Sequence, residues 1–141
     1  MPQSVATMEV THRMVRMIHA MLLVVVVLQT VVVEAVYGAS SAPLNPTFVD
    51  AITTVALLCA VSSVIVHIRI LRPALRALRV DPDNALSNKK YRAGSIISWA
   101  LALSVTIFGA KLRALGASTV QVAPFYLGGF ALLLALWPRR P

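Results

Sequence analysis

Four apolar stretches of about twenty residues each dominate this chain and leave little sequence for anything else. They cover approximately residues 17–37, 48–71, 93–110 and 118–137. A helix that rises ~1.5 Å per residue needs about this length to cross the ~30 Å hydrocarbon core of a bilayer. In lipid an unpaired backbone is so costly that each stretch must be helical. The sequence therefore predicts an all-α integral membrane protein with four transmembrane helices.

The composition favours a membrane protein over a soluble one. Hydrophobic residues make up 58% and charged residues 13% of the 141 positions, and the mean hydropathy is +0.80. A soluble domain carries about 25% charged residues. The first stretch is longer than the roughly 7–15 residues of a signal-peptide core, so we interpret it as a true span. Residues 1–12 are predicted to form a polar N-terminal tail, and residues 13–141 a single transmembrane domain.

The basic residues gather at the ends of stretches that would share one side of a membrane. Of the 13 Lys and Arg residues, two precede the first stretch, seven surround the connection between the second and third, and two follow the fourth. The other two, Lys111 and Arg113, follow the third stretch. Because Lys and Arg concentrate on the cytoplasmic side of membrane proteins, we predict that both termini are cytoplasmic.

The location of the chain follows from the same pattern. Tyr91, Trp99 and Trp137 are predicted to lie toward the inner surface, where aromatic rings prefer the headgroup level.

The abundance of Val, Ala and Arg suggests a GC-rich bacterium, so the predicted location is the bacterial inner (plasma) membrane. The net charge of +8 does not indicate nucleic acid, because interleaved aromatic residues and a binding motif are both lacking.

The connection between the second and third stretches is the longest and the most basic. Leu71, Leu75 and Leu78 recur on one helical face, and Pro73 is expected to kink the helix or start a new one. This pattern predicts a short basic amphipathic segment that lies on the inner headgroups. Six basic residues of the connection are predicted to bind anionic lipid or an acidic partner: Arg72, Arg76, Arg79, Lys89, Lys90 and Arg92.

Small residues mark the faces through which the helices are expected to pack. Ser95, Ser98, Ala102 and Thr106 fall on one stripe of the third stretch. Small residues at such spacing let helices approach closely in lipid. Ser63 lies one turn from His67, and its expected role is a hydrogen bond to a carbonyl of its own helix.

Four charged residues are expected near the outer surface, namely Glu34, Asp50, Lys111 and Arg113. We interpret them as ion pairs that join the outer ends of the helices. The alternative is that Glu34 is a carboxylate gate in a small oligomeric transporter or channel. Charged residues within spans are functional candidates by default, but this rule weakens at the interface.

Two histidines lie near the predicted cytoplasmic ends of the first two stretches. If these helices are neighbours, His19 and His67 stand at similar depth, and two imidazoles can hold a haem iron axially. Arg16 and Arg69 would then bind the propionates. The alternative function is therefore a haem-b or quinone-associated electron-transfer subunit. The simpler interpretation is two interfacial histidines that bind water, headgroups or backbone carbonyls.

The leading functional hypothesis is non-enzymatic. The sequence has no CxxC pair, no glycine-rich phosphate loop and no HExxH motif, and no serine of a span has an obvious neighbouring base. We predict an accessory or scaffolding subunit that packs within a larger membrane protein complex. Its expected partners are membrane lipids and either other membrane subunits or further copies of itself. No catalytic residue, metal or cofactor is predicted outside the haem alternative.

Overall fold

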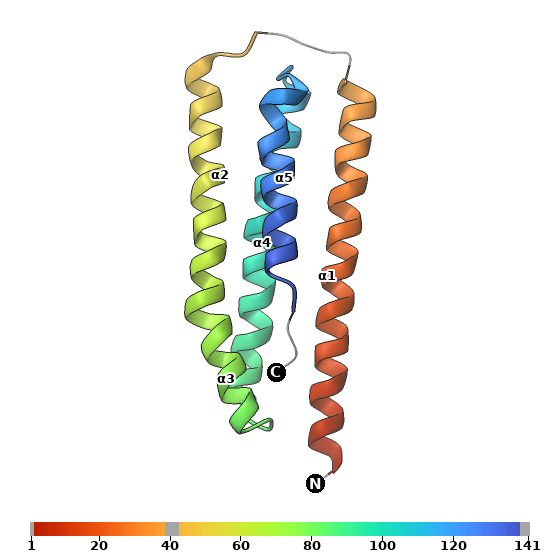
Figure 1. Cartoon of the computed structure of the whole chain (residues 1–141), viewed down its shortest axis with the longest axis vertical. Coiled ribbons are helices and arrows are strands. Elements are labelled where there is room, and N and C mark those ends of the chain that lie inside the picture. The colour runs from red at the N-terminus through yellow and green to blue at the C-terminus, as the bar shows by residue number, and fades with distance from the viewer. Residues whose placement is uncertain (1, 39–42, 139–141) are drawn as a thin grey trace.

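The computed structural model is a bundle of helical rods and describes residues 2–38 and 43–138, with the side chains of residues 2–8 and 11 excepted. Its helices are α1 (Pro2–Tyr37), α2 (Pro46–Val66), the π-helical turn η1 (His67–Leu71), α3 (Arg72–Val80), α4 (Ala85–Ala114) and α5 (Thr119–Ala135). Because α2, η1 and α3 follow one another without a gap, they form a single rod (Figure 1). The described residues contain no strand, which confirms the all-helical prediction.

Three of the rods are long and apolar enough to cross a membrane. They are His12–Tyr37 within α1, Pro46–Val80, and Ala85–Ala114. The fourth, α5, has 17 residues, which is at the lower end of the ~17–25 residues that span a bilayer. The start of α1, the α3–α4 connection and the end of α5 face one end of the bundle (Figure 1).

Helix α1 is longer than the sequence predicts. It begins at Pro2 and continues for 36 residues, so residues 2–12 of the predicted polar tail are helical. Proline suits the first position of a helix because its N–H would be unpaired there. No other proline and no glycine occurs before Gly38, so nothing in the sequence interrupts the helix.

The second rod bends where the sequence predicts a kink. Asn45 caps its start by accepting a hydrogen bond from the Thr47 backbone N–H at 3.0 Å, and Pro46 is the first helical residue. The π-helical turn η1 ends two residues before Pro73, which has no N–H to donate and whose ring crowds the preceding turn. After η1, α3 packs against α4. Its residues Ala74 and Leu78 are buried.

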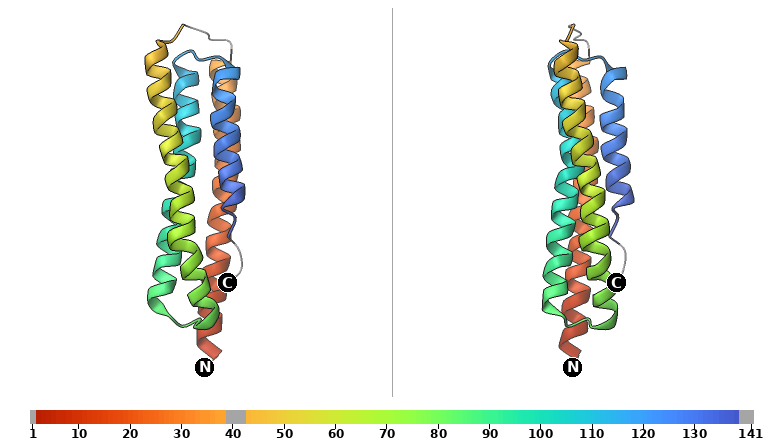
Figure 2. Two further views of the ribbon diagram at one scale, coloured as in Figure 1. Left: turned by 60° about the vertical axis from the view of Figure 1, so that its left-hand side comes forward. Right: turned by 90° about the vertical axis from the view of Figure 1, so that its left-hand side faces the viewer.

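Helix α4 is the centre of the bundle. It contacts all the other helices, whereas α1 contacts α4 and α5 but not α2 among the described residues (Figures 1 and 2). The condition on which the pairing of His19 with His67 depends, that the first two helices are neighbours, is therefore not met among the described residues. The reason is the small-residue face of α4, whose members are at most 1% exposed: Ser95, Ser98, Ala102 and Thr106. This face draws the neighbouring helices toward α4 instead of toward one another.

Two close contacts hold α2 and α5 on α4. Ser63 Oγ donates to the Ser98 carbonyl oxygen at 2.9 Å, and Ser98 Oγ donates to the Ser63 carbonyl oxygen at 3.2 Å. Ser63 thus bonds across to α4, and the prediction of a bond within its own helix is wrong. On α5, a Cβ added to Gly129 would overlap Thr106 Cγ2 and lie 3.3 Å from the Ala102 carbonyl oxygen. Only glycine permits this approach.

The turn between α4 and α5 is fixed by its own residues. Gly116 has a φ of 106°, which favours glycine, and the backbone N–H of Ala117 donates to the Leu112 carbonyl oxygen at 3.0 Å. Ser118 and Gln121 then form a capping box at the start of α5. The turn therefore sets the position of Arg113, in the last turn of α4, relative to Thr119.

Candidate functional site

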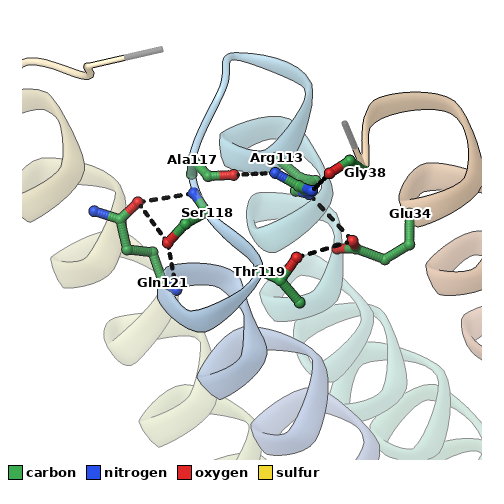
Figure 3. A network of polar contacts seen from close by, with 7 residues as sticks. All are labelled: Glu34, Gly38, Arg113, Ala117, Ser118, Thr119 and Gln121. Carbon is green, nitrogen blue, oxygen red and sulfur yellow. Dashed lines mark hydrogen bonds and ion pairs between the residues drawn. The ribbon is translucent and has the colours of Figure 1, made fainter. Parts of the chain in front are cut away.

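One end of the bundle is closed by a polar network centred on Arg113. Its Nε donates to Glu34 Oε2 at 3.2 Å, and Nη2 donates to the Gly38 carbonyl oxygen at 2.7 Å. Nη1 donates to the Ala117 carbonyl oxygen, and Thr119 Oγ1 donates to Glu34 Oε2 at 3.2 Å (Figure 3). We call these five residues the Glu34–Arg113 network. It joins α1, α4 and the start of α5.

The network brings together only two of the four charged residues predicted to pair at this end. Arg113 is 2% exposed and Glu34 is 28% exposed. Asp50 and Lys111 are exposed, and neither forms an ion pair with another described residue. The carbonyl oxygens of Gly38 and Ala117 were not foreseen, because a backbone acceptor has no signature in the sequence.

His19 lies inside an aromatic enclosure near the other end of α1. Its side chain is fully buried. The ring packs edge-on against Trp99, with centroids 4.9 Å apart, and against Trp137, with centroids 5.0 Å apart. The Arg16 guanidinium stands 6.0 Å from the centre of the Trp137 ring on the outside of this group. The packing of Trp99 and Trp137 on a histidine was not predicted from the sequence.

The haem alternative expected His67 to lie opposite His19. His67 instead belongs to η1, which does not contact α1 among the described residues. Arg69 is exposed. His67 lines a cavity that is also lined by Trp137, one of the ring neighbours of His19. The rings that pack on His19 in the described residues are those of Trp99 and Trp137, and not that of His67.

That cavity lies between η1, α3, the start of α4 and the residues after α5, and has a volume of about 260 Å³. Its lining combines basic, aromatic and apolar side chains: His67, Leu71, Arg72, Leu75, Arg76, Arg79, Tyr91, Trp137 and Pro138. We call it the basic cavity. Three of the six basic residues predicted to bind lipid or a partner line it. The other three, Lys89, Lys90 and Arg92, are exposed on the first turns of α4.

Tyr91 was expected at the inner headgroup level, but its place in the lining of the basic cavity was not predicted. It is 3% exposed, and its hydroxyl has no hydrogen-bond partner among the described residues. Its position between Lys90 and Arg92 could have indicated an anion-binding role, because a tyrosine hydroxyl can donate a hydrogen bond to an anion near basic residues. The lining of the cavity therefore combines three arginines with a tyrosine whose buried hydroxyl has no partner among the described residues.

Neither a metal site nor a known relative assigns a chemistry to these residues. The described residues contain no group of three His, Cys, Asp or Glu side chains that could hold a metal ion. Comparison of the chain with models of protein families, with curated proteins and with solved structures finds no match. The contacts within this chain are therefore the basis for proposing its function.

Proposed function

We propose that this chain is a small multi-pass membrane protein that serves as an accessory or scaffolding subunit of a larger membrane complex. The proposed setting is the bacterial inner membrane, with α5 as a fourth span and with both termini and the basic cavity on the cytoplasmic side. The distribution of Lys and Arg supports this orientation. The proposed mode of action is docking of α1 against a helix of a different membrane protein.

The observation that carries this proposal is an exposed stripe on α1. Its members share one helical face and are each more than half exposed: Met14, Met17, Met21, Val24 and Leu28. The buried residues of α1, namely Val15, His19 and Val26, lie on the opposite face. Methionine is flexible and polarisable, and proteins use it often at binding surfaces that must adapt to a partner. We call these five residues the methionine stripe.

The contacts of the polar groups also favour a structural role. Glu34 accepts hydrogen bonds from Arg113 and Thr119 at one end of the bundle, whereas a transporter places its key carboxylate near the middle of the membrane. Within the bundle, Ser63 and Ser98 bond to each other. These contacts stabilise the fold and leave Glu34 little freedom to act as a gate.

The haem alternative is not favoured by the surroundings of His19. Trp99 and Trp137 occupy the space beside the imidazole, so an iron could reach His19 only if the tryptophans moved. The same two contacts give His19 a simpler role, because they join α1 to α4 and to the segment after α5.

Photo-crosslinking from matched positions tests the docking proposal. A benzophenone side chain at Met21, within the methionine stripe, is compared with one at Leu58 on α2, because both residues are 61% exposed. In native membranes we expect a protein adduct of defined mass from Met21 and lipid adducts from Leu58. Lipid adducts alone from both positions would contradict the proposal. An adduct of twice the mass of the chain would assign the stripe to self-association instead.

A further inference from the structure

We propose that the basic cavity is a discrete site for the phosphate-bearing headgroup of an anionic phospholipid. This inference goes beyond the docking role of α1, because it concerns different residues and needs no protein partner. It rests on three features of the cavity: uncompensated positive charge, a buried hydroxyl without a partner, and a position next to a helix long enough to cross a membrane.

The positive charge comes from one face of α3. Arg72, Arg76 and Arg79 follow one another at spacings of four and three residues, so they project from the same side of the helix. All three line the cavity, and none forms an ion pair with an acidic side chain among the described residues. A guanidinium group matches the oxygens of a phosphate with two parallel hydrogen bonds. The three arginines therefore suit a phosphate better than a single point charge would.

The second feature is the hydroxyl of Tyr91, which no other described residue satisfies. A buried polar group without a partner destabilises a protein, and such groups are uncommon in native structures. Tyr91 lines the cavity together with the arginines of α3, and its hydroxyl is buried without a hydrogen-bond partner among the described residues. An anionic phosphate oxygen is a strong acceptor for this hydroxyl. Binding would thus satisfy the group that the protein alone leaves unsatisfied.

The location and size of the cavity favour a lipid over a soluble phosphate compound. Arg72 directly follows η1 in a rod whose apolar length is sufficient to cross a membrane, so the cavity lies where the rod would leave the hydrocarbon. Leu71, Leu75 and Trp137 give it an apolar wall suited to the glycerol and upper acyl carbons. Its volume of about 260 Å³ is slightly below the ~300–1,000 Å³ of sites that enclose drug-sized ligands. It would hold a headgroup while the acyl chains remain outside.

Native mass spectrometry of the purified full chain tests this site with two probes, phosphatidylglycerol and the zwitterionic phosphatidylcholine. We expect one phosphatidylglycerol to be retained per chain in preference to phosphatidylcholine. Tyr91→Phe removes only the hydroxyl and leaves the charge unchanged, and it should weaken this binding about ten-fold, because a hydrogen bond to a charged group is lost. Equal retention of the two lipids, or an unchanged affinity in Tyr91→Phe, would overturn the proposal.

Two triple variants separate a discrete site from a diffuse charge effect. One replaces Arg72, Arg76 and Arg79 with Gln, and the other replaces Lys89, Lys90 and Arg92 with Gln. Both remove three positive charges from the same end of the bundle, but only the first set lines the cavity. We expect the first variant to lose the bound phosphatidylglycerol and the second to keep it within about three-fold of the parent affinity. Equal losses would overturn the discrete site.

The source of the phosphate and the integrity of the fold are checked in parallel. Millimolar inorganic phosphate should not displace the retained lipid, and displacement would overturn the lipid assignment in favour of a soluble phosphate compound. Circular dichroism of each variant tests folding, and the conservative Tyr91→Phe change keeps the proposal testable if a triple variant unfolds. Failure of this site would leave the crosslinking result at Met21 unaffected, so the two proposals fail separately.

Discussion

Gly128 and Gly129 are adjacent in α5 but have different surroundings, so alanine should have opposite effects at the two positions. A Cβ on Gly129 would overlap Thr106 Cγ2 and lie 3.3 Å from the carbonyl oxygen of Ala102. A Cβ on Gly128 would meet no atom within 4 Å. In Gly129→Ala, α5 must therefore move away from α4 or Thr106 must shift.

The expected magnitudes follow from two opposing effects. Inserting a methyl group into a packed interface destabilises by typically ~1–3 kcal/mol. Replacing glycine with alanine inside a helix stabilises by up to ~1 kcal/mol. Gly129→Ala should therefore lower the free energy of unfolding by about 1–2 kcal/mol, and Gly128→Ala should raise it by about 0.5–1 kcal/mol. Adding Thr106→Ser to Gly129→Ala removes Cγ2 and should recover part of the loss.

The assay is equilibrium unfolding in mixed micelles with an increasing fraction of dodecyl sulfate. Trp99 is 2% exposed, and its fluorescence should report the loss of contact between α4 and α5. The contrast between the glycines controls for general effects on helix propensity or micelle binding. Equal shifts for Gly128→Ala and Gly129→Ala, in either direction, would refute the close α4–α5 contact.

Three further predictions use matched comparisons, two of substitutions and one of lipids. Arg113→Met should lower the free energy of unfolding by about 3 kcal/mol, because the buried Ala117 carbonyl oxygen and the partly buried Glu34 carboxylate lose their donor. Lys111→Met, at an exposed position, should change it by less than ~0.5 kcal/mol, and dodecyl sulfate unfolding measures both variants. Ser63→Ala should cost about 1 kcal/mol and the exposed Ser62→Ala almost nothing, and equal costs would contradict the serine pair. Brominated phosphatidylglycerol should quench the tryptophan fluorescence of the protein more than brominated phosphatidylcholine does, because Trp137 lines the basic cavity. Trp137→Phe should abolish this difference between the two lipids.

The sequence predicted the helices well because their signals are local. The length of each apolar stretch predicted an all-helical protein, and Pro73 predicted the bend that η1 provides. The small residues of α4, from Ser95 to Thr106, predicted its packing face, and these residues are buried. Each inference depends on one segment and on the cost of an unpaired backbone in lipid. None requires knowledge of which helices touch.

The helix neighbours could not be predicted, because they depend on pairs of residues far apart in the chain. The expected contact between α1 and α2 is absent from the described residues. Contacts such as Ser63 with Ser98 join segments that no local pattern relates. The burial of Trp99 was missed for a similar reason, because the preference of tryptophan for the interface does not reveal that His19 packs against its ring.

The partner of Glu34 illustrates the same limit at one residue. Lys111 and Arg113 stand two positions apart at the end of α4 and are equally plausible in the sequence. Residues at this spacing point to different sides of a helix, so only one of them can face α1. The structure brings Arg113 to Glu34. Whether Lys111 or Arg113 faces α1 depends on how α4 is rotated in the bundle. The small-residue face of α4 determines that rotation.

Two sets of contacts hold α1 in this bundle and leave another face of the same helix for a second protein. Glu34 contacts α4 and α5 at one end, and His19 packs against Trp99 and Trp137 toward the other. Both residues lie on the side of α1 opposite the methionine stripe. Because each attachment uses groups that the stripe does not contain, stripe substitutions such as Met21→Ala should weaken partner binding without loosening α1. Reduced stability of Met21→Ala in isolated protein would show instead that this face packs within the bundle.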